Sequence, residues 1–448
     1  MYFRKHFLCI LIMICLLSGC IPETVPELSS EAEPFAETAE QNESSEPGSE
    51  TEPLPEPKRF MGKIMDERIA LLNEKTVSNR QSGVRDVTRP DPVSGISVYE
   101  MMNRFSFPDV SYRNDRLMTE EEKEELLANR NVMEALKASL SSYSPYMEPR
   151  FGIVTENADL KMIPTSERIT KAPGERENDL NQESGLTIAS GVLIYAESSD
   201  GQFYFVLGEN DYGYVLKESV ALCDQDEFVS YLSPDEILVT VRPDPFDPLD
   251  RLGRILPVSE IKSSGTAAVR FPKRDADGRL ALSEVEVPFG DGKHVTGFLP
   301  FDPSAVRTIA ESMVGTEYGW GDRGNLYDCS AFAGAVYRCF GIYLPRNSGD
   351  FRFFGGEVID LKGKSFEEKA ELLSGSVGGI VLFPGHVMVI TEGESSKTVL
   401  IHAVKGWYNT AQEYVDAFKI SKTPVEELFS ADGSNWIDRF TTILRCRF

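Results

Sequence analysis

The sequence lacks the residue patterns of several well-known protein classes. Its 448 residues carry a formal net charge of −25, and a chain with no basic surplus is poorly suited to phosphate backbones, so we expect no nucleic-acid partner. Its seven cysteines are widely spaced and include no C-x-x-C pair, which excludes a zinc ribbon and a disulfide-rich scaffold. A single bridge, such as one between Cys223 and Cys446, is left open.

The N-terminus carries one apolar run, and this run is too short to span a bilayer comfortably. It covers residues 7–17 and follows a basic pair. The sequence LSGC begins at its last residue and places the cysteine at Cys20. Small residues before a cysteine at this place resemble a bacterial lipoprotein signal. The resemblance implies that residues 1–19 are removed and that Cys20 is lipidated, which predicts an extracytoplasmic protein anchored to a membrane. An ordinary secretory signal or a signal anchor is the alternative.

The segment 20–58 has a composition of its own. It is rich in Pro, Glu, Ser and Thr, and it holds eleven Glu but no basic residue before Lys58. Such a segment buries too little apolar surface to offset its ordering entropy, so we expect a disordered acidic linker. The rest of the chain is long enough for several domains.

Residues 59–147 are predicted to be mainly helical. The apolar residues from Met61 to Leu72 follow the helical period. A further helix is expected to begin at Thr119, because Glu122 stands three residues on in the capping-box arrangement. We expect that helix to break near 129–131.

Residues 148–300 are predicted to be β-structure. Apolar and aromatic residues alternate over 203–207, and a Gly-Glu-Asn-Asp turn separates them from a second such run, which is a hairpin signal. Short strands bounded by Gly, Pro and Asp favour small barrels, and the interval fits two, at 148–225 and 226–300.

The last region, residues 301–448, opens with helix signals and continues with strands. Asp302 is a good N-cap, and Pro303 suits the first helical position. A second helix is predicted from Ala331 to Phe340, and strand-like segments follow. A helical start followed by consecutive strands predicts an α+β domain with an antiparallel sheet.

Cys329 stands where a glycine-rich loop meets this second helix, in YGWGDRGNLYDCS. A thiol at a helix start lies near unpaired backbone N–H groups and the positive end of the helix dipole. Both favour the thiolate, which is the nucleophilic form. The alternative is a small buried apolar residue, and that is the only interpretation for Cys339.

Two of the four histidines follow in strand-like segments. His386 follows a Pro-Gly turn and begins the strand-like segment in FPGHVMVIT. His402 lies inside the strand-like segment TVLIHAV. If these segments are the two arms of a hairpin, one imidazole can take the thiol proton while the second imidazole orients the first. Structural roles are the alternative. His294 is expected to lie at the surface near a hairpin turn.

These motifs resemble the NlpC/p60 family of papain-like cell-wall cysteine peptidases. The similarity rests on YGWG…DCS, GHVMVI and LIHAV in that order, and on LPRNS at 344–348. It covers 301–448 and implies that Cys329 is the nucleophile, His386 the base and His402 the orienting residue. It also implies hydrolysis of the bond between D-Glu and a diamino acid in peptidoglycan stem peptides.

The resemblance extends upstream, to multidomain members with a helical clip and two bacterial SH3-like barrels, here 59–147, 148–225 and 226–300. In such members the first barrel closes one end of the cleft. By the same resemblance Tyr318, Asp328 and Ser330 hold the free N-terminal L-Ala of the substrate, and a carboxylate is a natural partner for an ammonium group. Asp328 is equally a helix N-cap and Tyr318 a core residue.

The sequence also departs from the family pattern. Asp322 stands where YGWGG has its last glycine, and Ala331 stands where a glycine usually follows DCS. Neither departure removes a catalytic group.

The sequence thus predicts a multidomain α+β protein that acts as a monomeric, membrane-anchored γ-D-glutamyl-diamino-acid endopeptidase on peptidoglycan peptides. It implies no metal or organic cofactor. A non-catalytic peptidoglycan-binding lipoprotein is one alternative, and an amidase or acyltransferase on the same scaffold is another.

Overall fold

The computed structural model describes residues 58–140, 145–175, 178–244, 247, 250–394 and 397–447. The predicted signal, Cys20 and the predicted linker up to Pro57 lie outside these residues and stay predictions. Within the described part of the chain, no helix is both long and apolar enough to cross a membrane.

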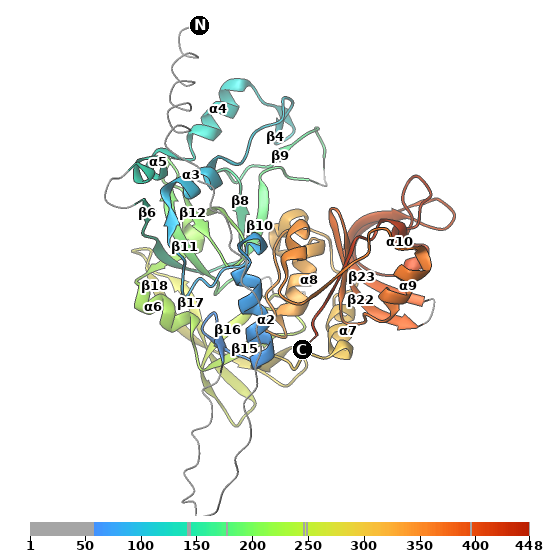
Figure 1. The fold of residues 1–448 in the computed structure, drawn as a ribbon. Helices are drawn as coiled ribbons and strands as arrows, with labels where there is room; N and C mark the ends of the chain where they lie inside the picture. The colour runs from blue at the N-terminus through green and yellow to red at the C-terminus, as the bar shows by residue number, and fades with distance from the viewer. Residues whose placement is uncertain are drawn as a thin grey trace, which may run out of the picture. The chain divides into compact units, whose positions relative to one another are not determined.

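The N-terminal region mixes short helices with two-residue strands (Figure 1). Its elements are α2 (Glu67–Ser78), α3 (Gly95–Asn103), α4 (Glu120–Ala128), α5 (Met133–Ser139), β1 (Arg59–Phe60), β2 (Lys63–Ile64), β3 (Val93–Ser94), β4 (Tyr112–Arg113), β5 (Arg116–Leu117) and β6 (Tyr146–Met147). The prediction of a helix from Met61 is wrong. Met61 and Gly62 adopt φ angles of 47° and 76°, so β1 and β2 form a tight antiparallel pair, and α2 begins only after its N-cap Asp66.

The predicted capping box at Thr119 is confirmed. The Thr119 side chain accepts from the Glu122 N–H, and the Glu122 side chain accepts from the Thr119 N–H. The break that follows is confirmed as well, because α4 ends at Ala128 and α5 begins at Met133. Asn131, between them, has a φ of 56°, which a continuous helix cannot contain.

Two antiparallel sheets follow in the chain. The first has the order β10-β8-β13-β12-β11-β7-β14, and the second has the order β18-β17-β16-β15-β19. The strands of the first are β7 (Arg150–Val154), β8 (Ala158–Lys161), β10 (Gln182–Leu186), β11 (Gly191–Glu197), β12 (Phe203–Leu207), β13 (Tyr212–Leu216) and β14 (Val220–Cys223). Those of the second are β15 (Glu236–Thr240), β16 (Ile255–Ile261), β17 (Thr266–Arg274), β18 (Leu280–Pro288) and β19 (His294–Thr296).

The junctions of these sheets add two features. The predicted hairpin is confirmed, because β12 and β13 pair from Phe203↔Leu216 to Leu207↔Tyr212. The helix α6 (Gln225–Leu232) separates the two sheets, and the short strand β9 (Ile169–Thr170) pairs with β4 instead of joining either sheet.

The C-terminal region is an antiparallel sheet with helices packed against it. The sheet order is β20-β25-β21-β22-β23-β24. Its strands are β20 (Glu357–Asp360), β21 (Ile380–Phe383), β22 (His386–Glu394), β23 (Lys397–Tyr408), β24 (Tyr414–Pro424) and β25 (Thr442–Arg445). Its helices are α7 (Pro303–Ser312), α8 (Cys329–Arg338), α9 (Phe366–Ser374) and α10 (Trp436–Arg439), with the turns η3 (Trp320–Asn325) and η4 (Ser348–Phe353).

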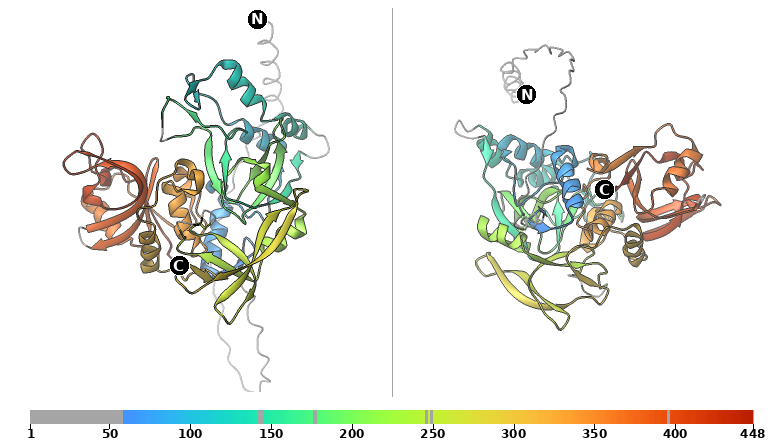
Figure 2. Two further views of the ribbon diagram at one scale, coloured as in Figure 1. Left: turned by 180° about the vertical axis from the view of Figure 1, so that it is seen from behind. Right: turned by 60° about the horizontal axis from the view of Figure 1, so that its bottom comes forward.

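The helix signals of this region are confirmed. Asp302 caps α7 with Pro303 in the first helical position, and the second helix covers 329–338. Figures 1 and 2 show α8 lying beside β22 and β23 when the sheet is seen from either side. The multidomain α+β class is therefore confirmed.

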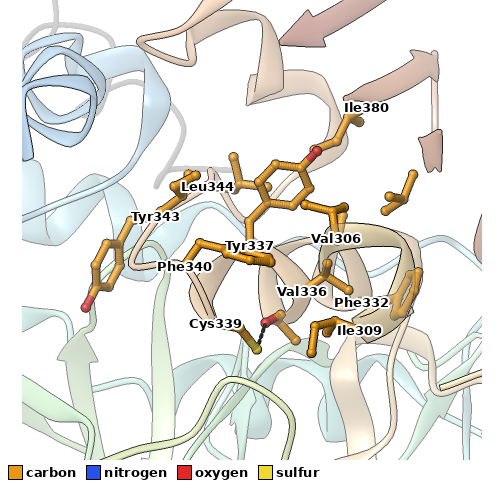
Figure 3. Packing of buried hydrophobic residues seen from close by; sticks show 14 of the residues in the cluster. Val306, Ile309, Phe332, Val336, Tyr337, Cys339, Phe340, Tyr343, Leu344 and Ile380 are labelled. Atoms are coloured by element: carbon orange, nitrogen blue, oxygen red, sulfur yellow. Dashed lines mark hydrogen bonds between the residues drawn. The ribbon is translucent and has the colours of Figure 1, made fainter. Parts of the chain in front are cut away.

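The largest buried apolar cluster surrounds α8 and fixes its position. Figure 3 shows Phe332, Val336 and Tyr337 of α8 packed with Val306 and Ile309 of α7. The same cluster includes Ile69 of α2, Val239 of β15 and Val389 of β22. One continuous core thus holds the N-terminal region, the second sheet and the C-terminal sheet around the helix that carries Cys329.

We expect Phe340→Ala to lower the free energy of unfolding by about 3–5 kcal/mol, because a fully buried aromatic leaves a cavity when it is truncated. Phe340 is 0% exposed, and its ring packs edge-on against Phe301 at 5.5 Å. Urea denaturation of the full chain measures the change. The matched control is Phe366→Ala, which removes a ring that is 47% exposed and should cost less than about 0.5 kcal/mol. Equal costs for the two variants would contradict this account of the core.

Candidate active site

Cys329 is the first residue of α8. The preceding residue, Asp328, is the N-cap and accepts a hydrogen bond from the Ala331 N–H at 2.9 Å. Cys329 is half-buried, and its sulfur interacts with the backbone N–H groups of Val387 and Ser330. Because Val387 follows His386 directly, the thiol lies against the start of β22. The helix start and the strand start therefore meet at the sulfur.

The helix end does not make Cys329 a thiolate at neutral pH. Burial raises the pKa of Cys329 to about 12, and the negative charge of Asp328 adds to the increase, whereas the N–H groups of Val387 and Ser330 and the charge of Arg346 act in the opposite direction. The Ser330 N–H at the helix start lowers the pKa of the thiol in the direction that the sequence predicts, but burial outweighs it in the free protein. The main physical reason is burial, which disfavours the charged thiolate, and the cap carboxylate places a further negative charge beside the sulfur. A base must remove the proton.

His386 and His402 form a hydrogen-bonded pair across two adjacent strands. His386 is the first residue of β22, and His402 lies within β23. His386 Nε2 and His402 Nδ1 are 2.8 Å apart. This bond occupies Nε2 of His386, so Nδ1 is the ring nitrogen that His402 does not engage. His402 Nε2 lies 3.5 Å from the Thr423 hydroxyl of β24, at the outer limit of a hydrogen bond.

Both imidazoles are held neutral. Burial lowers the pKa of His386 to about 4, against the opposing effect of Asp328. Burial and the neighbouring His386 hold the pKa of His402 well below its ordinary value. Trp436 of α10 packs edge-on against both rings, with centroid distances of 5.5 Å and 5.7 Å. A neutral His386 can accept a proton, and Trp436 covers part of both rings.

Asp328 and Ser330 belong to a buried network centred on Arg346. Arg346 donates to Asp328 Oδ2 at 2.8 Å, to Asp328 Oδ1 at 3.3 Å and to Ser330 Oγ at 2.9 Å. Ser330 Oγ in turn donates to Asp328 Oδ1 at 3.0 Å. Burial alone would raise the pKa of Asp328, but Arg346 and the cap bonds hold it below its ordinary value. Asp328 is thus a buried anion one residue from the sulfur.

The network continues into the first sheet. Arg346 Nε donates to Ser184 Oγ of β10 at 2.6 Å. The next carboxylates are Asp211 and Glu183, and burial together with the charge of Asp211 raises the pKa of Glu183 to about 7. Arg104 of the N-terminal region pairs with Glu183 at 2.8 Å. Charged groups from three regions therefore converge on the start of α8.

Tyr318 lies on the strand-like segment just before η3. It forms a parallel bridge with Tyr327, two residues before Cys329, and its ring packs edge-on against Phe418 at 6.3 Å. Lys405 Nζ lies 4.6 Å from the centre of the Trp320 ring. Trp320 also donates through Nε1 to the Asp179 carbonyl at 3.1 Å, which ties this loop to the segment before β10.

The sequence of residues 315–420 matches the NlpC/P60 family. The chain carries an NlpC/P60 domain. All three residues of the Cys329, His386 and His402 group lie inside the matched range, as do Tyr318, Asp328 and Ser330.

Solved structures of this family resemble the chain. An NlpC/P60 endopeptidase from Photobacterium damselae subsp. piscicida aligns over 85% of this chain and 93% of its own, with a TM-score of 0.63 and 19% identity. An NlpC/P60 family protein from Bacillus cereus aligns over 66% of this chain and 99% of its own, with a TM-score of 0.46 and 14% identity. No curated protein matches the sequence significantly. The first similarity shows that this chain shares its fold with that endopeptidase over most of its length, well beyond residues 315–420.

Sequence reasoning missed several residues of the site. Arg346 stands in the LPRNS segment of the NlpC/P60 domain, but nothing in the sequence linked it to Asp328. Trp436 and Ser184 lie far from the motifs in the chain, and no local signal marks them. The prediction for His294 is wrong: it is 9% exposed in β19, and its Nε2 lies 3.8 Å from Asp250. Cys223, Cys329, Cys339 and Cys446 are free thiols.

We expect alkylation of Cys329 by iodoacetamide to accelerate about tenfold per pH unit between pH 6 and 9, because a thiol with a pKa near 12 is mostly protonated there. The rate constant is measured by mass spectrometry of the peptide that contains Cys329. Cys339 in the same protein is 0% exposed and serves as an internal control that should stay unmodified. A rate that is flat from pH 5 to 8 would instead show a preformed thiolate–imidazolium pair.

Proposed function

We propose that this protein is a cysteine peptidase that hydrolyses γ-D-glutamyl-diamino-acid bonds in peptidoglycan stem peptides. One observation carries the proposal. Within an NlpC/P60 domain, the Cys329 sulfur lies against the start of β22, where His386 is bonded to His402 at 2.8 Å. A nucleophile, a neutral base and a group that orients the base are the three parts that acyl transfer needs.

The first step transfers the Cys329 proton to His386 Nδ1 and lets the sulfur attack the scissile carbonyl carbon. Separately, the two groups resist ionisation, because the pKa of the thiol is about 12 and that of the imidazole is about 4. The transfer creates adjacent opposite charges, which offset part of that cost. In this step His386 Nε2–H donates to His402 Nδ1, which is the tautomer that leaves Nδ1 of His386 able to accept the thiol proton.

The later steps reuse the same groups. The C–S bond forms while the carbonyl oxygen takes the negative charge. The backbone N–H of Cys329, at the first helical position, is suited to receive this oxyanion. The imidazolium of His386 gives its proton to the leaving amine as the C–N bond breaks. A water molecule then hydrolyses the thioester and restores the thiol.

The substrate's N-terminal end is assigned to Tyr318, Asp328 and Ser330. A free L-Ala carries an α-ammonium group, and Asp328 is a buried carboxylate one residue from the nucleophile. Arg346 already pairs with Asp328, so the ammonium group would add a contact to an existing network rather than fill an empty site. A substrate whose L-Ala nitrogen is blocked should therefore be a poor one.

The remaining regions are assigned by the same resemblance. Residues 59–147 are the clip, and residues 148–225 and 226–300 are two SH3-like barrels; the supporting observation is that each of the latter intervals contributes its own antiparallel sheet. Residues 1–19 are the signal and 20–58 the linker, and Cys20 carries a lipid anchor that holds a monomeric enzyme at the outer side of a membrane. Peptidoglycan peptides are the partners.

Two other functions use the same site. An amidase or acyltransferase would form the same thioester but pass the acyl group to, or take it from, a different molecule. A non-catalytic binding protein would hold the peptide without turnover. The half-buried thiol contacts the backbone N–H of Val387, and the preceding residue is the neutral His386 that is hydrogen-bonded to His402. This arrangement favours a catalytic role, because a binding protein has no need of a base there.

The full chain should release L-Ala-D-Glu from L-Ala-γ-D-Glu-diamino-acid peptide, and Cys329→Ser should abolish the release, because a hydroxyl is a far weaker nucleophile than the thiol. Liquid chromatography with mass spectrometry measures the products. Cys339→Ala, which changes a buried thiol ten residues further on, is the matched control and should keep its activity. Undiminished release by Cys329→Ser would refute the mechanism. Binding of the peptide by the full chain without release would favour the non-catalytic function. A product with the added mass of a transferred acyl group would favour the acyltransferase.

His402→Ala should lower kcat by at least about tenfold, because orientation and tautomer of the base are part of general-base catalysis. KM should change little, since His402 is fully buried and cannot touch the peptide. Thr423→Val, which removes the weaker 3.5 Å contact to His402 Nε2, should cost less. Steady-state kinetics on the tripeptide measures both variants. An unchanged kcat in His402→Ala would contradict the orienting role.

A further inference from the structure

The loop that precedes the nucleophile is held in an unusual conformation. Within η3, Gly321, Asp322, Gly324 and Asn325 have φ angles of 59°, 66°, 65° and 65°. This left-handed region favours glycine, and among other residues Asn and Asp enter it most readily. Asp322 is the position where the family pattern has a glycine. The departure therefore keeps the backbone conformation but adds a carboxylate.

That carboxylate is buried and paired with Arg251. The two side chains are 8% and 7% exposed, and the guanidinium forms an ion pair with Asp322 Oδ1. Arg251 comes from the segment between β15 and β16, so the pair joins the second sheet to the NlpC/P60 domain. On its other side Asp322 lies against β10: a Cβ placed on Gly185 would come within 3.0 Å of the Asp322 carbonyl oxygen.

Arg251 also contacts the rest of the same loop. Its Nη1 donates to Asn325 Oδ1 at 3.0 Å and to the Leu326 carbonyl at 3.4 Å. Its guanidinium lies 4.3 Å from the centre of the Tyr327 ring. The neighbouring Leu252 N–H donates to the Tyr327 hydroxyl at 3.0 Å. One planar guanidinium thus contacts both non-glycine left-handed residues and the chain that leads into Asp328 and Cys329.

The loop in turn links Tyr318 to the segment that leads into Cys329. Gly319 donates to the Tyr327 carbonyl at 3.0 Å, and Tyr318 bridges to Tyr327. A shift of 322–327 would therefore move Tyr318 and Trp320 on one side and Cys329 on the other. A buried ion pair with several added hydrogen bonds is better suited to fixing one geometry than to adding stability.

We infer that Arg251 is a positioning residue for the nucleophile, and that it acts through Asp322 and Asn325. The inference rests on the proposed function, since it assigns Arg251 to the alignment of Cys329 with His386. It makes the second sheet a required support of the active site. It also gives a reason for the aspartate in the family's glycine position.

The test separates positioning from stability. Arg251→Met leaves a buried carboxylate without its partner and should lower Tm. Asp322→Gly suits the left-handed backbone, so the double variant Arg251→Met/Asp322→Gly should recover most of that Tm. We expect kcat/KM on the tripeptide to stay at least about tenfold below wild type in the double variant, mainly through kcat, because small misplacements of reacting groups cost large rate factors. Arg251→Lys, which keeps the charge but not the planar fork, should recover only part of the rate.

Two results would overturn the inference. One is a double variant that recovers both Tm and kcat/KM to wild-type values. The other is an equal loss of kcat/KM in Arg254→Met, the burial-matched control, whose guanidinium pairs with Asp250 at 2.9 Å. Should wild type not cleave the tripeptide, the proposed function fails, and the alkylation rate of Cys329 in the same variants still tests Arg251. An unchanged alkylation rate in the double variant then overturns the inference.

Discussion

The 2.8 Å hydrogen bond between His386 and His402 is the interaction on which the candidate site depends. It exists because β22 and β23 are adjacent and in a fixed register, with Val389 opposite Ile401. His386 is three positions from Val389 and His402 is one position from Ile401, and both offsets are odd, so both imidazoles project from the same face of the sheet. A register shift of one residue would send one imidazole to the opposite face. The chemistry therefore depends on how well the strand pairing is specified.

Burial gives the site its electrostatic character. Asp328 and His402 are buried and Cys329 and His386 are half-buried, and three of these four groups respond by staying neutral. Asp328 is the exception, because Arg346 supplies a bidentate counter-charge. The result is a fixed anion beside a neutral nucleophile–base pair. Such a site creates charge only during the reaction, where a preorganised environment acts most strongly.

The domain that carries the matched sequence does not build this environment alone. Arg346 reaches Ser184 of the first sheet, Arg251 of the second sheet reaches the loop before Cys329, and Ile69 and Val239 share the core around α8. Each contact joins residues that are far apart in the chain. The site therefore has polar partners from outside the short motifs.

Local sequence determined the elements whose signals are short-range. The helix caps lie where the sequence predicts helix starts, at Thr119, Asp302 and Asp328. The candidate catalytic residues lie at a helix start, for Cys329, and on two hairpin strands, for His386 and His402. Both kinds of signal are local, because capping and alternation involve only neighbouring residues. Tertiary structure decided the rest. The helix α2 begins later than the sequence predicts, because Met61 and Gly62 turn the chain. The Cys329 thiol is neutral because folding buries it beside Asp328. The partners Arg251, Arg346 and Trp436 could not be found from sequence, since long-range packing leaves no periodic trace in a single chain.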